Sequence, residues 1–117
     1  MIRIKRVYGE QSSRDGSRIL VDRIWPRGIS KEQANLAAWR KDLAPSSSLR
    51  KWFGHDPDKW EVFKERYRKE LSSAELREAL KELAGLFRHK TITLLYGAAD
   101  EEHNQAVVLK ELLEELA

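Results

Sequence analysis

One short stretch of the chain gathers charged and aromatic side chains where an apolar run ends. Residues 21–33 read VDRIWPRGISKEQ. Arg23, Arg27 and Lys31 are suited to hold a carboxylate or a phosphate, because an arginine matches such anions with two parallel hydrogen bonds. Trp25 would supply an apolar wall or a stacking plane for the same ligand. The stretch therefore predicts an anion-binding pocket.

A second loop, YGAAD at residues 96–100, follows the last apolar run of the chain. Tyr96 would add another wall to the pocket, and Gly97 would let the backbone approach a ligand closely. Asn104 comes shortly afterwards and would reach the same pocket. A tight turn alone would also require the glycine, so the loop is equally consistent with a structural role.

Two side chains are candidates for acid–base catalysis. Asp22 would act as a base or orient an arginine, and His103 would serve as an acid or base because imidazole titrates near neutral pH. In the alternative interpretation, Asp22 pairs with a neighbouring cation and locks the corner, while His103 is a surface or capping residue. Whether the protein is an enzyme stays open.

The sequence predicts no metal site and identifies no cofactor. Its three histidines lack the paired spacing of zinc ligands, and it contains no cysteine.

Regular secondary structure must position these loops. Apolar and β-branched runs predict strands at residues 2–7, 18–24 and 91–96. Ser30 and Gln33 form a capping-box pattern, which predicts a helix from Lys31 towards Trp39. Four further helical segments are expected behind capping residues: Ser46 for a turn reaching Phe53, Asp56 for a helix to about Leu71, Ser72 for a helix through Phe87, and Asp100 for a last helix through Leu116.

Strands separated by helical segments favour parallel pairing. We therefore expect a single α/β domain over residues 1–117, a small three-layer domain with a mostly parallel sheet of few strands flanked by helices. The ten-residue loop between the first two strands leaves open whether they pair in parallel or as a hairpin. Ligands of open parallel sheets bind beyond the carboxyl ends of the strands, which is where both candidate loops would lie.

The composition narrows the classes of partner. The chain has 22 basic and 19 acidic residues, a net charge of +3, which is well short of a protein that coats nucleic acid. No apolar run approaches the length of a membrane span, so we expect a cytoplasmic protein without a membrane partner.

Three motifs resemble one bacterial family. They read VDRIWPRGISKE, LAPSSSLRKWFGHDPDKWEVFKERYRKEL and TLLYGAADEEHNQAVVLKELL. Together they are similar to the short, YeaO-like branch of domain of unknown function 488. The resemblance implies an α/β fold and supplies no reaction. Longer relatives carry a cysteine-bearing motif near the last strand; the matching region here has no cysteine, so thiol chemistry does not transfer. The matching motif positions are Asp22, Arg23, Trp25, Pro26, Arg27, Gly28, Lys31, Pro45, Ser46, Arg50, Trp52, Phe53, His55, Tyr96, His103 and Asn104.

Three functional hypotheses follow. The leading one is a domain that binds an anionic small ligand (a phosphate, nucleotide or carboxylate) at the carboxyl edge of its sheet. The second is a nucleic-acid-binding accessory protein that uses the cations and rings of LRKWF at residues 49–53. The third is a non-catalytic structural or regulatory partner domain. The sequence does not predict an oligomeric state.

Overall fold

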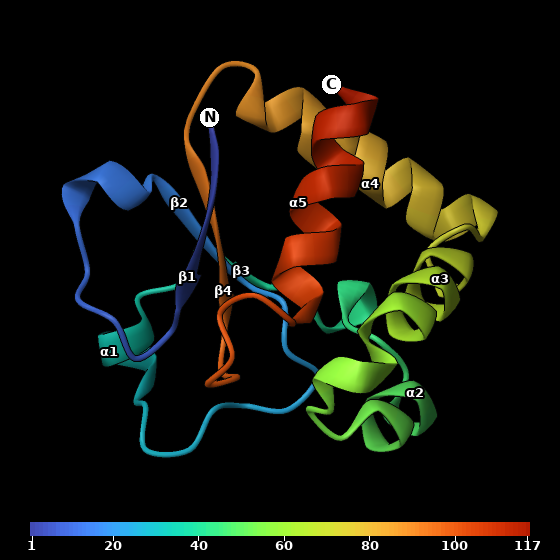
Figure 1. The fold of residues 1–117 in the computed structure, drawn as a ribbon. Helices are drawn as coiled ribbons and strands as arrows, with labels where there is room; N and C mark the ends of the chain where they lie inside the picture. The colour runs from blue at the N-terminus through green and yellow to red at the C-terminus, as the bar shows by residue number, and fades with distance from the viewer.

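Four parallel strands form the central sheet of the computed structural model, which describes residues 1–117 (Figure 1). The strands are β1 (Ile2–Arg6), β2 (Ser17–Leu20), β3 (Ala38–Trp39) and β4 (Ile92–Tyr96). Their order is β1-β4-β2-β3, and every pairing is parallel. The first two strands therefore do not pair with each other; each lies beside β4. The expected α/β fold with a parallel sheet is confirmed.

Two apolar clusters lie on the two faces of the sheet. Along β4, Ile92, Leu94 and Tyr96 belong to the larger cluster, whereas Leu95 belongs to the smaller one, as the two-residue period of a strand requires. Helices α2 (Ser47–Phe53), α3 (Trp60–Glu70), α4 (Ala74–Phe87) and α5 (Gln105–Leu116) supply most of the rest of the larger cluster. Figure 1 shows α3, α4 and α5 on one side of the strands and α1 (Lys31–Ala34) on the other.

The helix expected from Lys31 towards Trp39 is much shorter than predicted. Its capping box is present, with Ser30 and Gln33 bonded to each other's backbone N–H groups. The helix nevertheless ends at Asn35, which takes a left-handed conformation with φ of 46°. Asparagine tolerates this conformation better than most residues, and the chain then extends into β3, which pairs with β2.

Two helix caps also differ from the prediction. Ser73, not Ser72, caps α4, and Asn104, not Asp100, caps α5. The amide oxygen of Asn104 accepts hydrogen bonds from the N–H groups of Ala106 and Val107. The expected cap by Ser46 is confirmed. Asp56 caps a short turn, Pro57–Lys59, that leads into α3.

A buried ion-pair cluster lies beside the smaller apolar cluster. Arg18 Nη1 is 2.6 Å from Asp15 Oδ2, and Lys5 Nζ is 3.0 Å from Asp15 Oδ1. Asp15 and Arg18 are only 1% and 4% exposed. Burial raises the pKa of Asp15, but hydrogen bonds from Lys5, the Ser12 backbone and Arg18 outweigh burial and hold that pKa below its ordinary value. The cluster joins the loop before β2 to β1.

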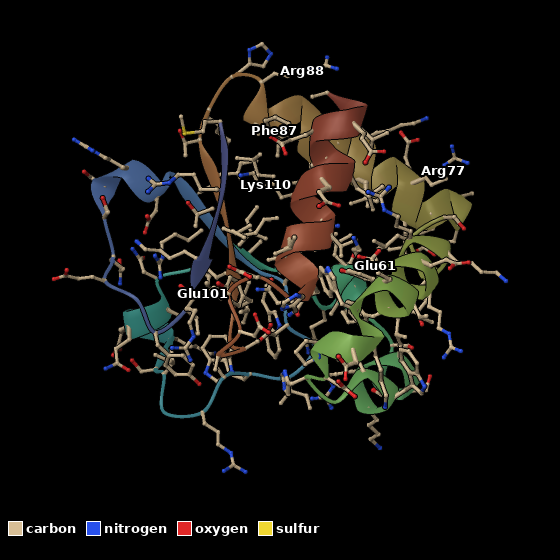
Figure 2. All side chains as sticks on the ribbon, in the orientation of Figure 1. Glu61, Arg77, Phe87, Arg88, Glu101 and Lys110 are labelled. Carbon is tan, nitrogen blue, oxygen red and sulfur yellow. The ribbon has the colours of Figure 1, made fainter.

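The outer surface is dominated by charged side chains. Figure 2 shows Arg77 and Arg88 projecting from the ribbon at α4, and both are exposed. None of the helices combines the length and the apolar composition needed to cross a membrane.

Candidate functional site

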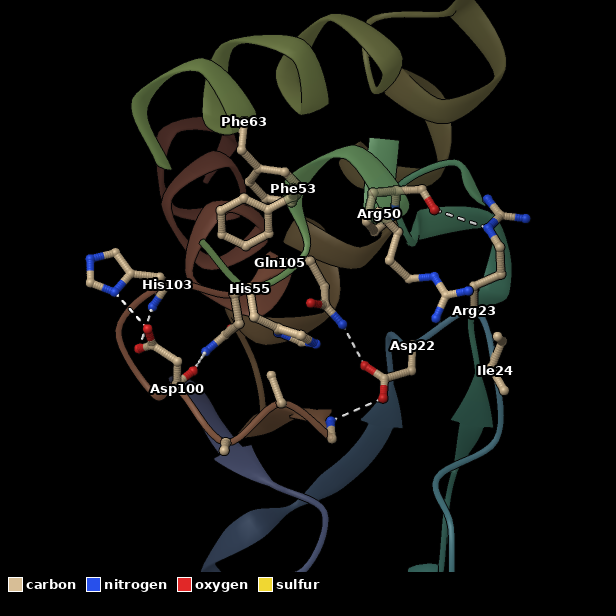
Figure 3. Close-up of a pocket in the computed structure, with 15 residues that line it drawn as sticks. Asp22, Arg23, Ile24, Arg50, Phe53, His55, Phe63, Asp100, His103 and Gln105 are labelled. Carbon is tan, nitrogen blue, oxygen red and sulfur yellow. Dashed lines mark hydrogen bonds and ion pairs between the residues drawn. The ribbon is translucent and has the colours of Figure 1, made fainter. Parts of the chain in front are cut away.

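A cavity of about 420 Å³ lies beyond the carboxyl ends of β2 and β4 (Figure 3). Because both strands run in the same direction, the segments that follow them open at one edge of the sheet. The lining comes from four segments: Asp22, Arg23 and Ile24 after β2; Gly97, Ala98, Ala99 and Asp100 after β4; His103, Asn104 and Gln105 at the start of α5; and Pro45, Arg50, Phe53, His55 and Phe63 around α2 and α3.

Asp22 is anchored at the base of the cavity by two donors. Its Oδ2 accepts a hydrogen bond of 2.9 Å from the backbone N–H of Gly97, and its Oδ1 accepts one from the side-chain amide of Gln105. No arginine or lysine forms an ion pair with it. The corner-locking pair considered from the sequence is therefore replaced by contacts to β4 and α5.

Burial raises the pKa of Asp22 from its ordinary value of 3.8 to about 6. The hydrogen bonds from Gly97 and Gln105, and the nearby charges of Arg50 and His55, act in the opposite direction but do not offset the burial. The carboxyl group therefore changes charge close to neutral pH.

Two arginines at the cavity lack a carboxylate partner. Arg23 donates from Nε to the carbonyl of Pro45 at 2.9 Å and from Nη2 to the carbonyl of Ala44 at 3.3 Å. The side chain of Arg50 makes neither an ion pair nor a hydrogen bond within the protein. Figure 3 shows the Arg50 guanidinium group above Asp22, whereas the Arg23 guanidinium group is turned towards the carbonyl of Pro45. Neither positive charge is neutralised by an ion pair within the protein.

His103 lines the same cavity but does not contact Asp22. Its Nδ1 lies 2.8 Å from Asp100 Oδ2, and its ring packs edge-on against Trp60 with the centroids 5.3 Å apart. Hydrogen bonds from the backbone of Glu102 and the side chain of His103 lower the pKa of Asp100. Figure 3 shows the His103 ring turned away from Asp22, so the two residues share no proton directly.

A protein-family model matches the whole chain. The model described as "Inactive DUF488-N3 subclade" matches residues 1–117. The chain belongs to this DUF488 family. The uncharacterised protein YeaO of Escherichia coli is 42% identical over 115 residues, which are 98% of each chain. An uncharacterised protein of Mycobacterium tuberculosis is 39% identical over 112 residues, 96% of this chain and 92% of the relative. No solved structure matches significantly. The resemblance seen in the sequence is thereby confirmed.

This DUF488 chain brings five of the predicted site residues to the cavity: Asp22, Arg23, Gly97, His103 and Asn104. They meet because the segments after β2 and β4 adjoin one another at the sheet edge. Their proposed roles in binding or catalysis stay predictions.

Four predicted ligand-binding residues do not line the cavity. Trp25 packs with Trp39, with ring centroids 5.2 Å apart, and donates from Nε1 to the carbonyl of Ile29 at 2.7 Å. Arg27 is exposed, and its carbonyl accepts a hydrogen bond from the hydroxyl group of Tyr8. Lys31 is exposed at the start of α1, and Tyr96 is buried in the larger apolar cluster.

The chain direction explains this difference. After Ile24 the DUF488 chain crosses to the other face of the sheet, where Trp25 packs against the smaller apolar cluster. Of residues 21–33, only Asp22, Arg23 and Ile24 line this cavity. A binding role for Trp25, Arg27, Lys31 and Tyr96 stays a prediction.

The lining residues outside the predicted site set include Arg50, His55 and Gln105. Arg50 and His55 stand among the family's motif positions, which was the available signal. No feature of the sequence pointed to Gln105, because its contact with Asp22 depends on the first residue of α5 lying beside the segment that follows β2. No group of three or more histidine, aspartate and glutamate side chains is placed to hold a metal ion.

Proposed function

We propose that this DUF488 protein binds an anionic small molecule in the cavity beyond β2 and β4, and that it does so without catalysis. The observation that carries the proposal is the pair of arginines, Arg23 and Arg50, that line the cavity without a carboxylate partner. An arginine without a counter-ion beside a concave site is suited to a phosphate or carboxylate.

The cations, rather than a helix end, are the basis of the anion preference. The first N–H groups of α5 are directed at the amide oxygen of Asn104, which accepts from Ala106 and Val107. Arg23 is held in place by two backbone carbonyls, so one wall of the binding site is ordered before a ligand arrives.

Binding is better supported than catalysis. Asp22 and His103 are the acid–base candidates, yet they do not contact each other: Asp22 is bonded to Gly97 and Gln105, and His103 to Asp100. The matching family model carries the description "inactive", which agrees with a binding role.

The nucleic-acid hypothesis has less support than the small-ligand proposal. Stacking on a base would require a free face of Trp52. Arg66 Cζ lies 4.3 Å from the centre of that ring, and Lys59 Nζ lies 5.2 Å from it. Two cations of the protein itself therefore already pack against this ring.

Isothermal titration calorimetry with inorganic phosphate tests the proposal. Arg50→Met is expected to weaken phosphate binding roughly tenfold, because it removes a charge-assisted hydrogen bond worth about 1.5 kcal/mol. Lys51→Met is the matched control, since Lys51 is exposed, adjacent in the same helix and absent from the cavity wall. Absence of phosphate binding, or equal losses in both variants, would overturn the proposal.

A further inference from the structure

The cavity has hydrogen-bond acceptors on one side and cationic donors on the other. Two of the roughly four acceptor positions of the Asp22 carboxylate are taken by Gly97 and Gln105, so about two remain for a ligand. The Gln105 side chain uses its amide nitrogen towards Asp22, which leaves its amide oxygen without a partner inside the protein. Figure 3 shows this oxygen on the side of the Gln105 amide that faces His55, while the amide nitrogen is directed at the Asp22 carboxylate.

Two neighbouring acceptors of this kind match a pair of neighbouring hydroxyl groups. A hydroxyl donates a strong hydrogen bond to a carboxylate, and a second hydroxyl one carbon away would reach the other acceptor. A simple dicarboxylate fits poorly, because one of its negative groups would face Asp22. A neutral polyol would leave Arg23 and Arg50 without an anion.

The remaining wall is apolar. Phe53 is 6% exposed and Phe63 is 2% exposed, and both line the cavity together with Ala98. Figure 3 shows the two rings above Asp22, between α3 and the loop after β4. Such a wall suits the apolar face of a sugar ring or a planar base.

Resting on the proposed function, we propose that the anion is the phosphate ester of a sugar with two neighbouring hydroxyls, as in ribose 5-phosphate or a ribonucleotide. The hydroxyls donate to Asp22 and to the Gln105 amide oxygen, and the phosphate accepts from Arg50 and Arg23. Inorganic phosphate, which has no sugar, would contact only Arg23 and Arg50. A site that pairs with a hydroxyl discriminates against ligands that lack it, because its acceptors are then left without a donor.

Calorimetric titration of the full chain with a series of probes tests this inference. The probes are inorganic phosphate, methyl phosphate, ribose 5-phosphate, 2-deoxyribose 5-phosphate and AMP. Ribose 5-phosphate is expected to bind at least about tenfold more tightly than methyl phosphate or the deoxy sugar, consistent with about 1.4 kcal/mol for a hydroxyl that pairs with a carboxylate. Tighter binding of AMP than of ribose 5-phosphate identifies a ribonucleotide, and the reverse order identifies a free sugar phosphate.

Variants separate the two sides of the site. Asp22→Asn is expected to abolish the preference for ribose 5-phosphate over methyl phosphate while inorganic phosphate binds as well as before or better. Gln105→Met, which removes the amide oxygen but preserves side-chain length, is expected to reduce the preference as well. Lys51→Met should change neither the preference for ribose 5-phosphate nor the affinity for inorganic phosphate.

The two proposals fail in different ways. Equal affinities for methyl phosphate and ribose 5-phosphate would overturn the sugar assignment while the anion-binding function stands. Failure of every probe to bind would overturn the anion-binding function itself. A ribose preference that persists in both Asp22→Asn and Gln105→Met would also overturn the assignment to these acceptors.

Discussion

The backbone N–H of Gly97 donates a 2.9 Å hydrogen bond to Asp22 Oδ2 and thereby joins the residues that follow β4 and β2. A Cβ atom placed on Gly97 would lie 2.8 Å from that oxygen. Real Cβ atoms do not approach an oxygen so closely, so the absence of a side chain at residue 97 is a requirement of this contact. The position of the Asp22 carboxylate therefore depends on glycine at residue 97.

Gly97→Ala is expected to displace the Asp22 carboxylate and to lower the free energy of unfolding by about 1–3 kcal/mol, the cost of leaving a buried donor without its partner. Urea denaturation followed by circular dichroism measures this change.

Gly85→Ala provides the control for the glycine substitution. Gly85 lies inside α4, and no atom stands within 4 Å of the position of its added Cβ. Alanine is preferred over glycine in a helix, so this variant should gain about 0.5–1 kcal/mol of stability. Destabilisation by Gly85→Ala, or no effect of Gly97→Ala, would contradict the steric argument.

Asp22 should make the stability of the protein depend on pH. Its pKa is about 6 in the folded chain against an ordinary 3.8, so the folded state binds more protons between these values and stability falls as the pH rises through them. A shift of this size corresponds to roughly 3 kcal/mol, since one pKa unit is about 1.4 kcal/mol.

Asp22→Asn removes this titration. The difference in unfolding free energy between the native sequence and the variant, measured by urea denaturation at pH 4 and pH 7, should shift in favour of the variant at the higher pH. A difference that does not change with pH would show that the carboxyl group titrates normally.

Anion binding should also depend on pH, because the Asp22 carboxyl group titrates in the complex as well. A bound anion beside Asp22 disfavours the charged carboxylate, so binding takes up a proton and strengthens as the pH falls. The other charged or titratable groups at the cavity are Arg23, Arg50, His55, Asp100 and His103.

Sulfate is the suitable probe for this effect because its own charge is constant over the range. Its affinity is expected to rise roughly tenfold from pH 8 to pH 5.5, the effect of one like-charge interaction at a partly exposed site. Asp22→Asn should flatten much of this dependence. An affinity that stays constant in the native sequence would contradict the prediction.

The sequence predicted the layers of the fold because apolar periodicity and caps are local signals. The runs at β1, β2 and β4 alternate or are continuously apolar, and Ser46 acts as the expected cap. The two-residue strand β3 was missed, because a left-handed Asn35 decides where α1 ends and the sequence pattern does not encode that conformation uniquely.

The candidate site was only partly predictable for a different physical reason. Placing Asp22 near Gly97 required only that two parallel strands end at one edge. Excluding Trp25 and Arg27 from the cavity required knowing that the chain crosses to the other face after Ile24, where Trp39 offers an aromatic partner. The path of the chain after Ile24 is determined by packing between residues distant in sequence.

The ion-pair cluster at Asp15 should be essential for stability, although it lies away from the cavity. Asp15 neutralises Lys5 and Arg18, and Arg18 is 4% exposed and has only the carbonyl of Ala34 as a further partner. Asp15→Asn therefore leaves a buried guanidinium without a counter-charge. The expected loss is about 3–5 kcal/mol of unfolding free energy.

Asp42→Asn is the matched control, because Asp42 also pairs with an arginine but at the surface. Arg40 Nη2 lies 2.9 Å from Asp42 Oδ2, with the two side chains 31% and 49% exposed. Solvent screens this pair, so its loss should cost less than about 1 kcal/mol. Thermal and urea unfolding of both variants measures the contrast. Similar losses for the two would mean that Arg18 finds another partner, and the cluster would then not be what fixes the loop before β2 to β1.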